Sequence, residues 1–354
     1  MVHGTVAPGY EGVRAAFERC FAELGETGAQ FAAFVRGRPV ADLWGGEGMS
    51  RDALVHVYSV TKAAAAFSVL VLADRGALAL DDRVATHWPA FGAAGKGDVT
   101  VRGLLSHQAG VVALREPRPP ALLLDWDATC AALAAEAPWW PPGTGHAEHA
   151  LFYGHLAGEL VRRVDGRTLG AFWRDEVAGP WSLDLHVGLR DAELARTVDL
   201  RGAFGEPRSD LYRQALDNPP GARDLAVVNG EAWRRAEIPA VNGHATALGV
   251  ARLYAGLVAG GVLDGVRLVR PETVAAMHAG ERTDHDPLLE EVVTWGLGVW
   301  VDHDGFGMAG IGGSLGMADP DTGLAEAYVT REMGSHERCE VLDAALRAAV
   351  AALS

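Results

Sequence analysis

Apolar residues alternate near both ends of the chain and recur with helical spacing between them. The first segments are a helix over Gly12–Leu24 and a hairpin of the strands Phe31–Val35 and Val40–Leu43. Near the other end the pattern predicts four strands and a closing amphipathic helix: Leu297–Asp302, Phe306–Gly310, Ser314–Asp319, Leu324–Val329 and Cys339–Leu353.

Between these ends, from about Leu78 to about Leu288, the pattern is mostly helix and loop. Four longer helices are predicted there: Asp125–Ala135, His149–Asp165, Ala245–Val262 and Pro271–Gly280. The stretch Asp199–Asn229 is irregular and long enough to be a functional loop. Strands at both ends around a helical insertion fit an α/β sheet domain combined with an all-helical domain.

The stretch Ser59-Val60-Thr61-Lys62 stands between an extended apolar run and a long apolar helix. Ser59 is therefore expected at or near the N-terminus of that helix, with Lys62 one turn further on the same face. A serine hydroxyl is a weak nucleophile until a neighbour removes its proton, and a lysine amine can do this when burial lowers its pKa. Backbone N–H groups at a helix N-terminus can also hold a developing oxyanion.

The same four residues would fit a serine cap and a surface lysine, because many helices carry S-x-x-K by chance. However, Ala63–Ala73 contains no charged residue, so this helix is predicted to be buried nearly all round. A charged lysine in the first turn of a buried helix costs free energy of folding, so it is rarely found there without a function. The composition of the helix therefore favours a Ser-Lys nucleophile.

A family resemblance supports the same interpretation. The chain resembles the class C β-lactamase-like serine hydrolases in the segment VYSVTKAAAAFSVLVLADRGALALDDRVATHWPAF and in the following VTVRGLLSHQAGV. That superfamily includes family VIII esterases, penicillin-binding-protein-like proteins, D-aminopeptidases and several acyltransferases. The resemblance extends unevenly from about Gln30 to the C-terminus. It implies an α/β fold in which N- and C-terminal helices flank an antiparallel sheet and an all-helical domain is inserted. We expect residues 1–77 and 289–354 in the sheet domain, 78–288 in the helical domain, and the active site in the cleft between them.

The second motif of this superfamily supplies a tyrosine that shares proton transfer with the lysine. The segment PPGTGHAEHALFYGHLAGELVRRVDG resembles it, and alignment from Pro142-Gly143-Thr144 puts Glu148 at the tyrosine position. Tyr153 could replace the tyrosine only if the register differs, and otherwise packs as a helix residue. Glu148 is expected to pair with Lys62, which would raise the pKa of the lysine and make the carboxylate a candidate base. The alternative is a glutamate that turns to solvent or caps the next helix.

The third motif usually brings a lysine or histidine to a strand that lines the site. The segment FGMAGIGGSLGMADPDTGLAEAYV resembles that strand, but Met308 occupies this position and cannot donate a hydrogen bond. Met308 is therefore apolar filler or the lining of an acyl pocket. The resemblance implies that Gly310 and Ile311 border the substrate, with the N–H of Ile311 as the second oxyanion donor.

Other pieces resemble the family outside the three motifs. Asn242-Gly243-His244 is one of them, and Asn242 is a candidate substrate-binding residue. Both Asn242 and His244 could instead fix a loop through hydrogen bonds. His107, within the matching LLSHQAG, is expected to be structural.

The composition of the chain limits the kinds of partner that we expect. Arg and Lys number 31 against 46 Asp and Glu, so the net charge of −15 disfavours nucleic acid and anionic membranes. Cys20, Cys130 and Cys339 are too few and too far apart for a disulfide framework or a metal site, and we expect neither metal nor cofactor. The N-terminus lacks the features of a signal peptide, and the longest apolar run is too short to span a bilayer. We therefore expect a cytoplasmic monomer or homodimer that acts on a small-molecule acyl donor and acceptor.

These observations predict an acyl-transfer enzyme that forms an acyl-enzyme on Ser59 from a small ester, thioester or amide. It would be an esterase or amidohydrolase, or, given the altered motifs, a specialised transacylase or cyclase of biosynthesis. β-Lactamase activity is not expected, because Met308 removes the usual partner of the substrate carboxylate. Two alternatives remain: a catalytically retired fold that binds a small molecule, and chemistry carried by His146, His149 and His155.

Overall fold

The computed structural model describes residues 1–353 and contains one large antiparallel sheet. Its strand order is β1-β3-β2-β15-β14-β13-β12-β11-β10, so the two ends of the chain meet in the middle of the sheet where β2 pairs with β15. The strands are β1 Val2–Val6, β2 Gly28–Val35, β3 Arg38–Gly46, β10 Arg282–Asp286, β11 Glu291–Trp295, β12 Trp300–Asp302, β13 Gly305–Ala309, β14 Leu315–Asp319 and β15 Leu324–Thr330. The predicted terminal strands and the α/β fold are confirmed.

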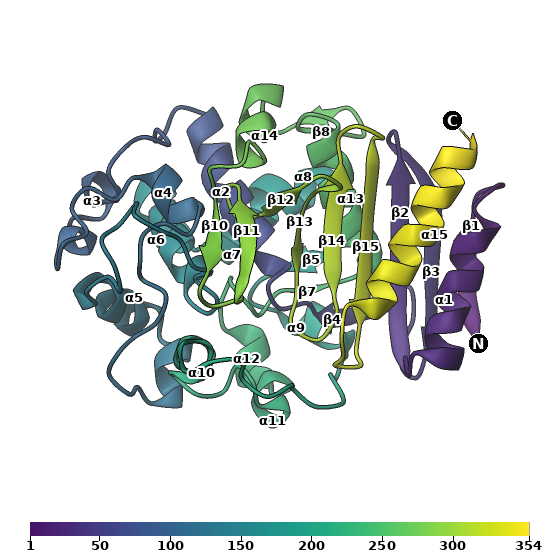
Figure 1. Cartoon of the computed structure of the whole chain (residues 1–354), viewed down its shortest axis with the longest axis horizontal. Helices are drawn as coiled ribbons and strands as arrows, with labels where there is room; N and C mark the ends of the chain where they lie inside the picture. Colours follow the sequence, from purple (N-terminus) through teal and green to yellow (C-terminus); the bar gives the residue numbers. More distant parts are fainter. Residues whose placement is uncertain (354) are drawn as a thin grey trace.

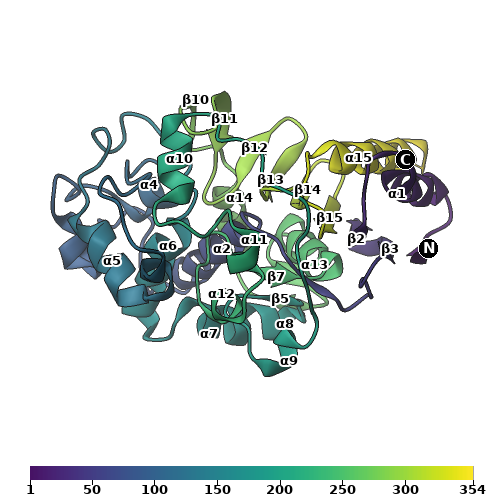
Figure 2. The same ribbon diagram turned by 90° about the horizontal axis from the view of Figure 1, so that it is seen from below.

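Helices cover both faces of this sheet. The helices of the described residues, on the sheet and beside it, are α1 Glu11–Glu23, α2 Thr61–Asp74, α3 Val84–His87, α4 Val101–Leu105, α5 Trp126–Ala135, α6 Tyr153–Asp165, α7 Leu169–Trp173, α8 Gly179–Trp181, α9 Asp191–Leu194, α10 Asp210–Asp217, α11 Leu225–Val228, α12 Glu231–Arg235, α13 Ala247–Val258, α14 Pro271–Met277 and α15 Glu337–Leu353. Helices α1 and α15 pack together on one face, and α13 packs on the other against β2, β14 and β15 (Figures 1 and 2). The terminal helices thus flank the sheet as expected.

Short elements complete the chain. A second, small sheet contains β4 Leu54–His56, β5 Leu185–His186, β6 Thr197–Val198 and β7 His244–Ala245, and β8 Val262–Leu263 and β9 Val266–Arg267 form a hairpin. The remaining elements are the 3₁₀ turns Pro89–Gly92 and Pro120–Leu124 and the π-helical turn Arg174–Ala178. Within residues 1–353, none of the helices has both the length and the apolar character needed to cross a lipid bilayer.

The segment between residues 78 and 288 is less purely helical than its pattern predicted. Strand β10 belongs to the large sheet, and α13 packs on that sheet although both elements lie within the predicted helical segment. The hairpin of β10 and β11 is missing from the sequence prediction because its alternating residues are largely polar or exposed. Helix α10 likewise lies inside a stretch that was predicted to be irregular.

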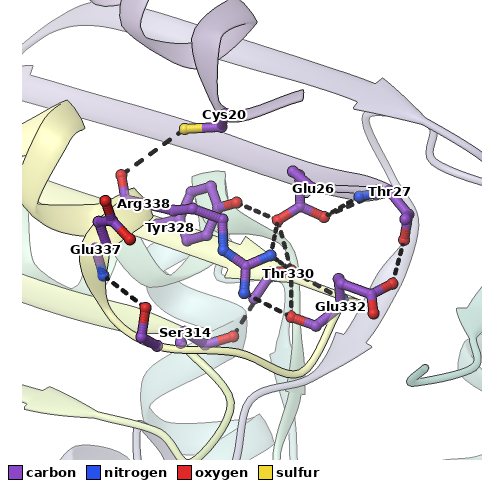
Figure 3. Close-up of polar contacts among 12 residues, drawn as sticks. Cys20, Glu26, Thr27, Ser314, Tyr328, Thr330, Glu332, Glu337 and Arg338 are labelled. Carbon is purple, nitrogen blue, oxygen red and sulfur yellow. Dashed lines mark hydrogen bonds and ion pairs between the residues drawn. The ribbon is translucent and has the colours of Figure 1, made fainter. Parts of the chain in front are cut away.

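A buried polar cluster ties the end of β15 to the start of α15 (Figure 3). The Glu26 carboxylate pairs with the guanidinium of Arg338 at 2.6 Å and accepts a hydrogen bond from Thr330 Oγ1 at 2.8 Å. Arg338 also donates to the carbonyl of Glu332, and the next residue, Cys339, donates through Sγ to the carbonyl of Gly313 at 2.9 Å. The cluster therefore anchors the loop between β13 and β14, which borders the site described next.

Candidate active site

Ser59 lies where β4 leads into α2. The preceding residue, Tyr58, has a φ of +46°, a left-handed conformation that costs an aromatic residue about 1–3 kcal/mol. Surrounding contacts hold it there, because its hydroxyl donates to the carbonyl of Ala222 at 3.1 Å and its ring packs edge-on against His56. This sharp turn brings Ser59 to the start of α2, at the N-terminus of a buried helix as expected.

Lys62 is completely buried on α2, a helix whose residues are almost all apolar. Its ammonium has three protons and three acceptors: Ser59 Oγ at 2.6 Å, Glu148 Oε1 at 2.9 Å and the carbonyl of Ala240 at 3.2 Å. Burial lowers the pKa of Lys62, and the nearby Glu148 carboxylate opposes this without reversing it. Pairing with Glu148 therefore acts to raise the pKa of the lysine, as expected, but desolvation is the larger effect and the net shift is downward.

Glu148 comes from the loop before α6 and points to Lys62, so it neither turns to solvent nor caps the helix. Its own backbone N–H donates to Asp286 Oδ2 at 2.8 Å. Asp286 also accepts from Trp295 Nε1 at 3.0 Å and from the N–H of Leu288 at 2.9 Å. Burial raises the pKa of Asp286, and the charge of Glu148 adds to that rise. Asp286 thus fixes the backbone that carries Glu148.

Tyr153 does not replace the missing tyrosine. It is the first residue of α6, its side chain is fully buried, and its hydroxyl donates to the carbonyl of Leu105 at 3.0 Å. The alignment that puts Glu148 at the tyrosine position agrees with this arrangement, since Glu148 is the side chain that reaches Lys62.

The end of β13 and the loop after it form the wall opposite Glu148. A methyl group at Gly310 would lie 2.3 Å from the carbonyl oxygen of Val57, so only glycine lets this loop approach the segment that carries Ser59 so closely. Within residues 1–353 the backbone N–H groups of Ser59 and Ile311 donate to no backbone carbonyl. These two groups are therefore available to a ligand.

A cavity of about 700 Å³ opens over Ser59. Of the predicted site residues, the structure brings Ser59, Glu148, Met308, Gly310 and Ile311 to its wall, with Lys62 directly beneath Ser59. The remaining wall includes Phe204, Arg208, Tyr212, Leu289, Trp295, Trp300 and His336. Met308 is almost completely buried and presents an apolar surface there, in agreement with both of its expected roles.

Asn242 is not part of this wall, which corrects its assignment as a substrate-binding residue. Its side chain is completely buried, accepts from the N–H of Ile238 at 2.9 Å and donates to the carbonyls of Trp233 and Ala236. Every polar atom of the amide is thus occupied in fixing one loop, the alternative that the sequence left open. The neighbouring His244 is buried too, and its Nδ1 lies 2.9 Å from the carbonyl of Asn242.

The histidines before and within α6 do not line the cavity. Burial and the charge of Lys62 lower the pKa of His149 to about 3, and burial lowers that of His155 to about 3. His107 accepts from the N–H of His149 through Nδ1 at 2.9 Å, which is a structural contact. His146, His149 and His155 therefore do not surround a common site at which they could replace Ser59.

The wall residues that the sequence prediction missed include Arg208, Tyr212 and His336. Arg208 and Tyr212 lie in the stretch 199–229, whose length suggested a functional loop. Because this stretch was predicted to be irregular, the helix α10 that carries Tyr212 and the direction of its side chains were not inferred. His336 precedes α15 and lies 3.2 Å from the carbonyl of Gly310 through Nε2. Burial lowers its pKa, so it is neutral at physiological pH.

One candidate metal-ligand group occurs within the described residues, and its Asp302 lines the same cavity as Ser59. Asp302, His303 and Asp304 bring ligand atoms within 4.8 Å of one another on a largely exposed turn between β12 and β13. Next to Ser59 and Lys62, the carboxylate of Glu148 is already paired with the lysine. This set fits proton transfer rather than metal binding.

Comparisons with known proteins identify relatives of this chain in sequence and in fold. The sequence model of the Beta-lactamase family matches residues 13–351. The Esterase/beta-lactamase LipL of Mycobacterium tuberculosis is 35% identical over 93% of this chain and 82% of its own length. A crystal structure of a family VIII carboxylesterase superposes with a TM-score of 0.93 at 36% identity, over 99% of this chain and 100% of that one. A penicillin-binding protein homologue from Caulobacter crescentus gives a TM-score of 0.92 at 38% identity, with the same coverage.

Proposed function

Because this chain belongs to the β-lactamase family and is a serine hydrolase of that fold, we propose that Ser59 is its nucleophile. The reaction is transfer of an acyl group through an ester on Ser59 Oγ. Carboxylic esters are the proposed substrates, because two of its relatives are named an esterase and a carboxylesterase. Thioesters and activated amides have the same electrophilic carbonyl and are further candidates.

One observation carries the proposal: Lys62 Nζ lies 2.6 Å from Ser59 Oγ and 2.9 Å from Glu148 Oε1 at the floor of the cavity. An ammonium cannot accept the serine proton, so Lys62 first has to pass one of its own protons on. In the proposed step Lys62 takes the proton of Ser59 while giving one to Glu148. Glu148 is the terminal base, and Lys62 is the relay that keeps the serine and the carboxylate in contact.

The tetrahedral intermediate needs donors for its oxyanion. The N–H groups of Ser59 and Ile311 are free of backbone acceptors and border the same cavity. Donors fixed before the reaction stabilise the developing charge without reorganising, and losing one typically costs about 10²–10³ in rate. Because both donors are backbone groups, this contribution does not depend on Met308.

Met308 favours esters over β-lactam antibiotics. A thioether provides neither charge nor a hydrogen bond for the carboxylate of a penicillin or cephalosporin. We therefore expect no useful turnover of these compounds. Hydrolysis of nitrocefin at rates typical of enzymes, about 10 per second, would contradict this part of the proposal.

The acyl acceptor is water in a hydrolase and an alcohol or amine in a transacylase. Water and an alcohol or amine are both proposed as acceptors, because a cavity of about 700 Å³ leaves room for an acceptor beside a small acyl group. Hydrolysis of a p-nitrophenyl ester with and without an added alcohol measures the partition, since transfer yields a new ester instead of free acid.

The nucleophile is tested by labelling with a fluorophosphonate probe and mapping the adduct by mass spectrometry. We expect one adduct, on Ser59, and none in Ser59→Ala. A matched control is Ser68→Ala on the same helix, because Ser68 is buried and its hydroxyl donates to the carbonyl of Ala64. This variant should label like the wild type. Absence of an adduct on Ser59 at every pH would favour the alternative, a fold that only binds a small molecule.

A further inference from the structure

Tyr212 lines the same cavity as Glu148 and Ile311. It belongs to α10, where the Ser209 hydroxyl accepts from its backbone N–H at 3.1 Å and so fixes the start of the helix. Its half-buried side chain lines the cavity together with Ser59 and Glu148. It packs against the same apolar cluster as Ile311, a cluster that includes Ala150 and Leu216. The ring is therefore held on the wall of the cavity that opens over Ser59.

The phenol of Tyr212 is unused by the protein. Three other tyrosines, Tyr58, Tyr153 and Tyr328, donate their hydroxyl protons to Ala222, Leu105 and Glu26. Among residues 1–353 no group forms a hydrogen bond with the hydroxyl of Tyr212. A donor on a cavity wall, next to a nucleophile and without an internal partner, is available to a substrate.

The charges around Tyr212 keep its proton in place. Burial raises the pKa of Tyr212, and the nearby carboxylate of Glu148 raises it further, while Arg223 and Arg208 oppose the change. The guanidinium of Arg223 lies 5.6 Å from the centre of the ring and is itself held by Asp217 at 3.1 Å. Tyr212 is thus a neutral phenol at physiological pH, able to give a proton but not to take one.

We propose that Tyr212 is the general acid that protonates the leaving group, while Glu148 is the base, so that two residues divide these roles. This inference rests on the function proposed above. In acylation the bond from Ser59 Oγ to the carbonyl carbon forms, and the bond from that carbon to the leaving oxygen breaks. The serine proton passes through Lys62 to Glu148, and the leaving oxygen takes the proton of Tyr212. The Glu148–Lys62 pair then returns its extra proton to the phenolate, so that the alcohol departs neutral.

The test varies the leaving group at constant acyl group. Acetates of p-nitrophenol, phenol and ethanol are compared in the wild type and in Tyr212→Phe by their kcat/KM. An alkoxide needs a proton to depart, whereas p-nitrophenolate does not. We therefore expect a loss of about 100-fold for ethyl acetate, the usual scale for one general acid, and of less than about threefold for p-nitrophenyl acetate. Tyr10→Phe, at the remote start of α1, is the matched control and should change neither rate.

Each outcome has a separate meaning. Equal losses on all three esters, or no loss on any, would overturn the role of Tyr212 as leaving-group acid. Fluorophosphonate labelling of Tyr212→Phe at the wild-type rate is expected, because fluoride departs without a proton, and lost labelling would point to a damaged site instead. If the wild type neither labels on Ser59 nor hydrolyses p-nitrophenyl acetate, the proposed function itself fails, and this result is distinct from any effect of Tyr212.

Discussion

Two buried ion pairs in this protein have opposite surroundings. Glu26 and Arg338 form a pair at the junction of β2, β15 and α15, and Lys62 and Glu148 form a pair beneath the cavity. Both join one glutamate to one cation at hydrogen-bond distance, and both are removed from bulk water. Charge and distance along the chain do not distinguish them, because each is an acidic and a basic residue far apart in the sequence. Only the family resemblance singled out Lys62 and Glu148 as a pair.

The Glu26 pair is closed on itself, as Figure 3 shows. One carboxylate oxygen of Glu26 accepts from the N–H groups of Thr27 and Gly28, and the other accepts from Tyr328, Thr330 and Arg338. No position is left for a ligand. Such a pair serves the fold, because it satisfies every group that it buries.

The Lys62 pair is open on one side. One of the three protons of Lys62 goes to the hydroxyl of Ser59, a group that can react, and Glu148 borders the cavity. The comparison teaches that a buried pair becomes a candidate for chemistry when one of its hydrogen bonds ends on a nucleophile at a cavity. Variants of the two pairs should accordingly affect different properties.

Lys62→Met should have the largest effect. It removes the relay between Ser59 and Glu148 while nearly preserving side-chain volume, so ester hydrolysis should fall on the order of 10⁴-fold, the upper range for a positioned proton-transfer group. The melting temperature should change little, because Glu148 can contact water in the cavity. Steady-state kinetics and thermal unfolding on the same sample measure both. Activity within tenfold of the wild type would place the chemistry elsewhere.

Arg338→Met should have the converse effect. Breaking a closed buried pair leaves the Glu26 carboxylate uncompensated and typically costs about 3–5 kcal/mol of unfolding free energy. Urea unfolding should show this loss, while the fluorophosphonate labelling rate, measured well below the midpoint, stays within a few-fold of the wild type. A variant that kept its stability but lost its labelling would reverse the roles assigned to the two pairs.

Glu148→Gln should have a smaller effect than loss of the lysine. The amide keeps the size and hydrogen bonding of the carboxylate but cannot accept the proton, so turnover should fall about 100-fold and the pH dependence of kcat should change. Glu148→Tyr restores the residue expected from the family resemblance and should recover ordinary ester hydrolysis. Unchanged kinetics and pH dependence in Glu148→Gln would show that the carboxylate has no part in proton transfer.

The smallest effect is expected at His155, a buried ionisable residue that should change the pH dependence of stability. Neither ring nitrogen of His155 has a hydrogen-bond partner within the described residues, and burial lowers its pKa to about 3. Because the unfolded chain binds a proton near the usual pKa of about 6.5 and the folded chain does not, this residue reduces stability as the pH falls from about 6.5 toward 3.

His155→Phe removes that titration and keeps the ring packing against Trp126. Its melting temperature should therefore fall less between pH 7 and pH 5 than that of the wild type, by a few degrees. An identical pH dependence in the two proteins, measured by thermal unfolding, would show that His155 does not titrate differently in the folded and unfolded states.

Several features followed from the sequence because they depend on neighbouring residues. The terminal strands alternate, the α2 segment is uncharged for eleven residues, and Ser59 and Lys62 are separated by one helical turn. Helical geometry alone brings such a pair onto one face. The position of Glu148 was also predictable, through the resemblance of its segment to the second motif.

Other features were decided by the tertiary structure, because they depend on residues that only folding brings together. The net direction of the pKa shift of Lys62 depends on burial by the whole fold as well as on Glu148. Asn242 was a candidate substrate-binding residue in the sequence, but in the fold its amide forms hydrogen bonds with Trp233, Ala236 and Ile238. Tyr212 reaches the cavity from α10, a helix inside a stretch that was predicted to be irregular. Local spacing determines which side chains share a face, whereas solvation and partners are set by packing across the chain.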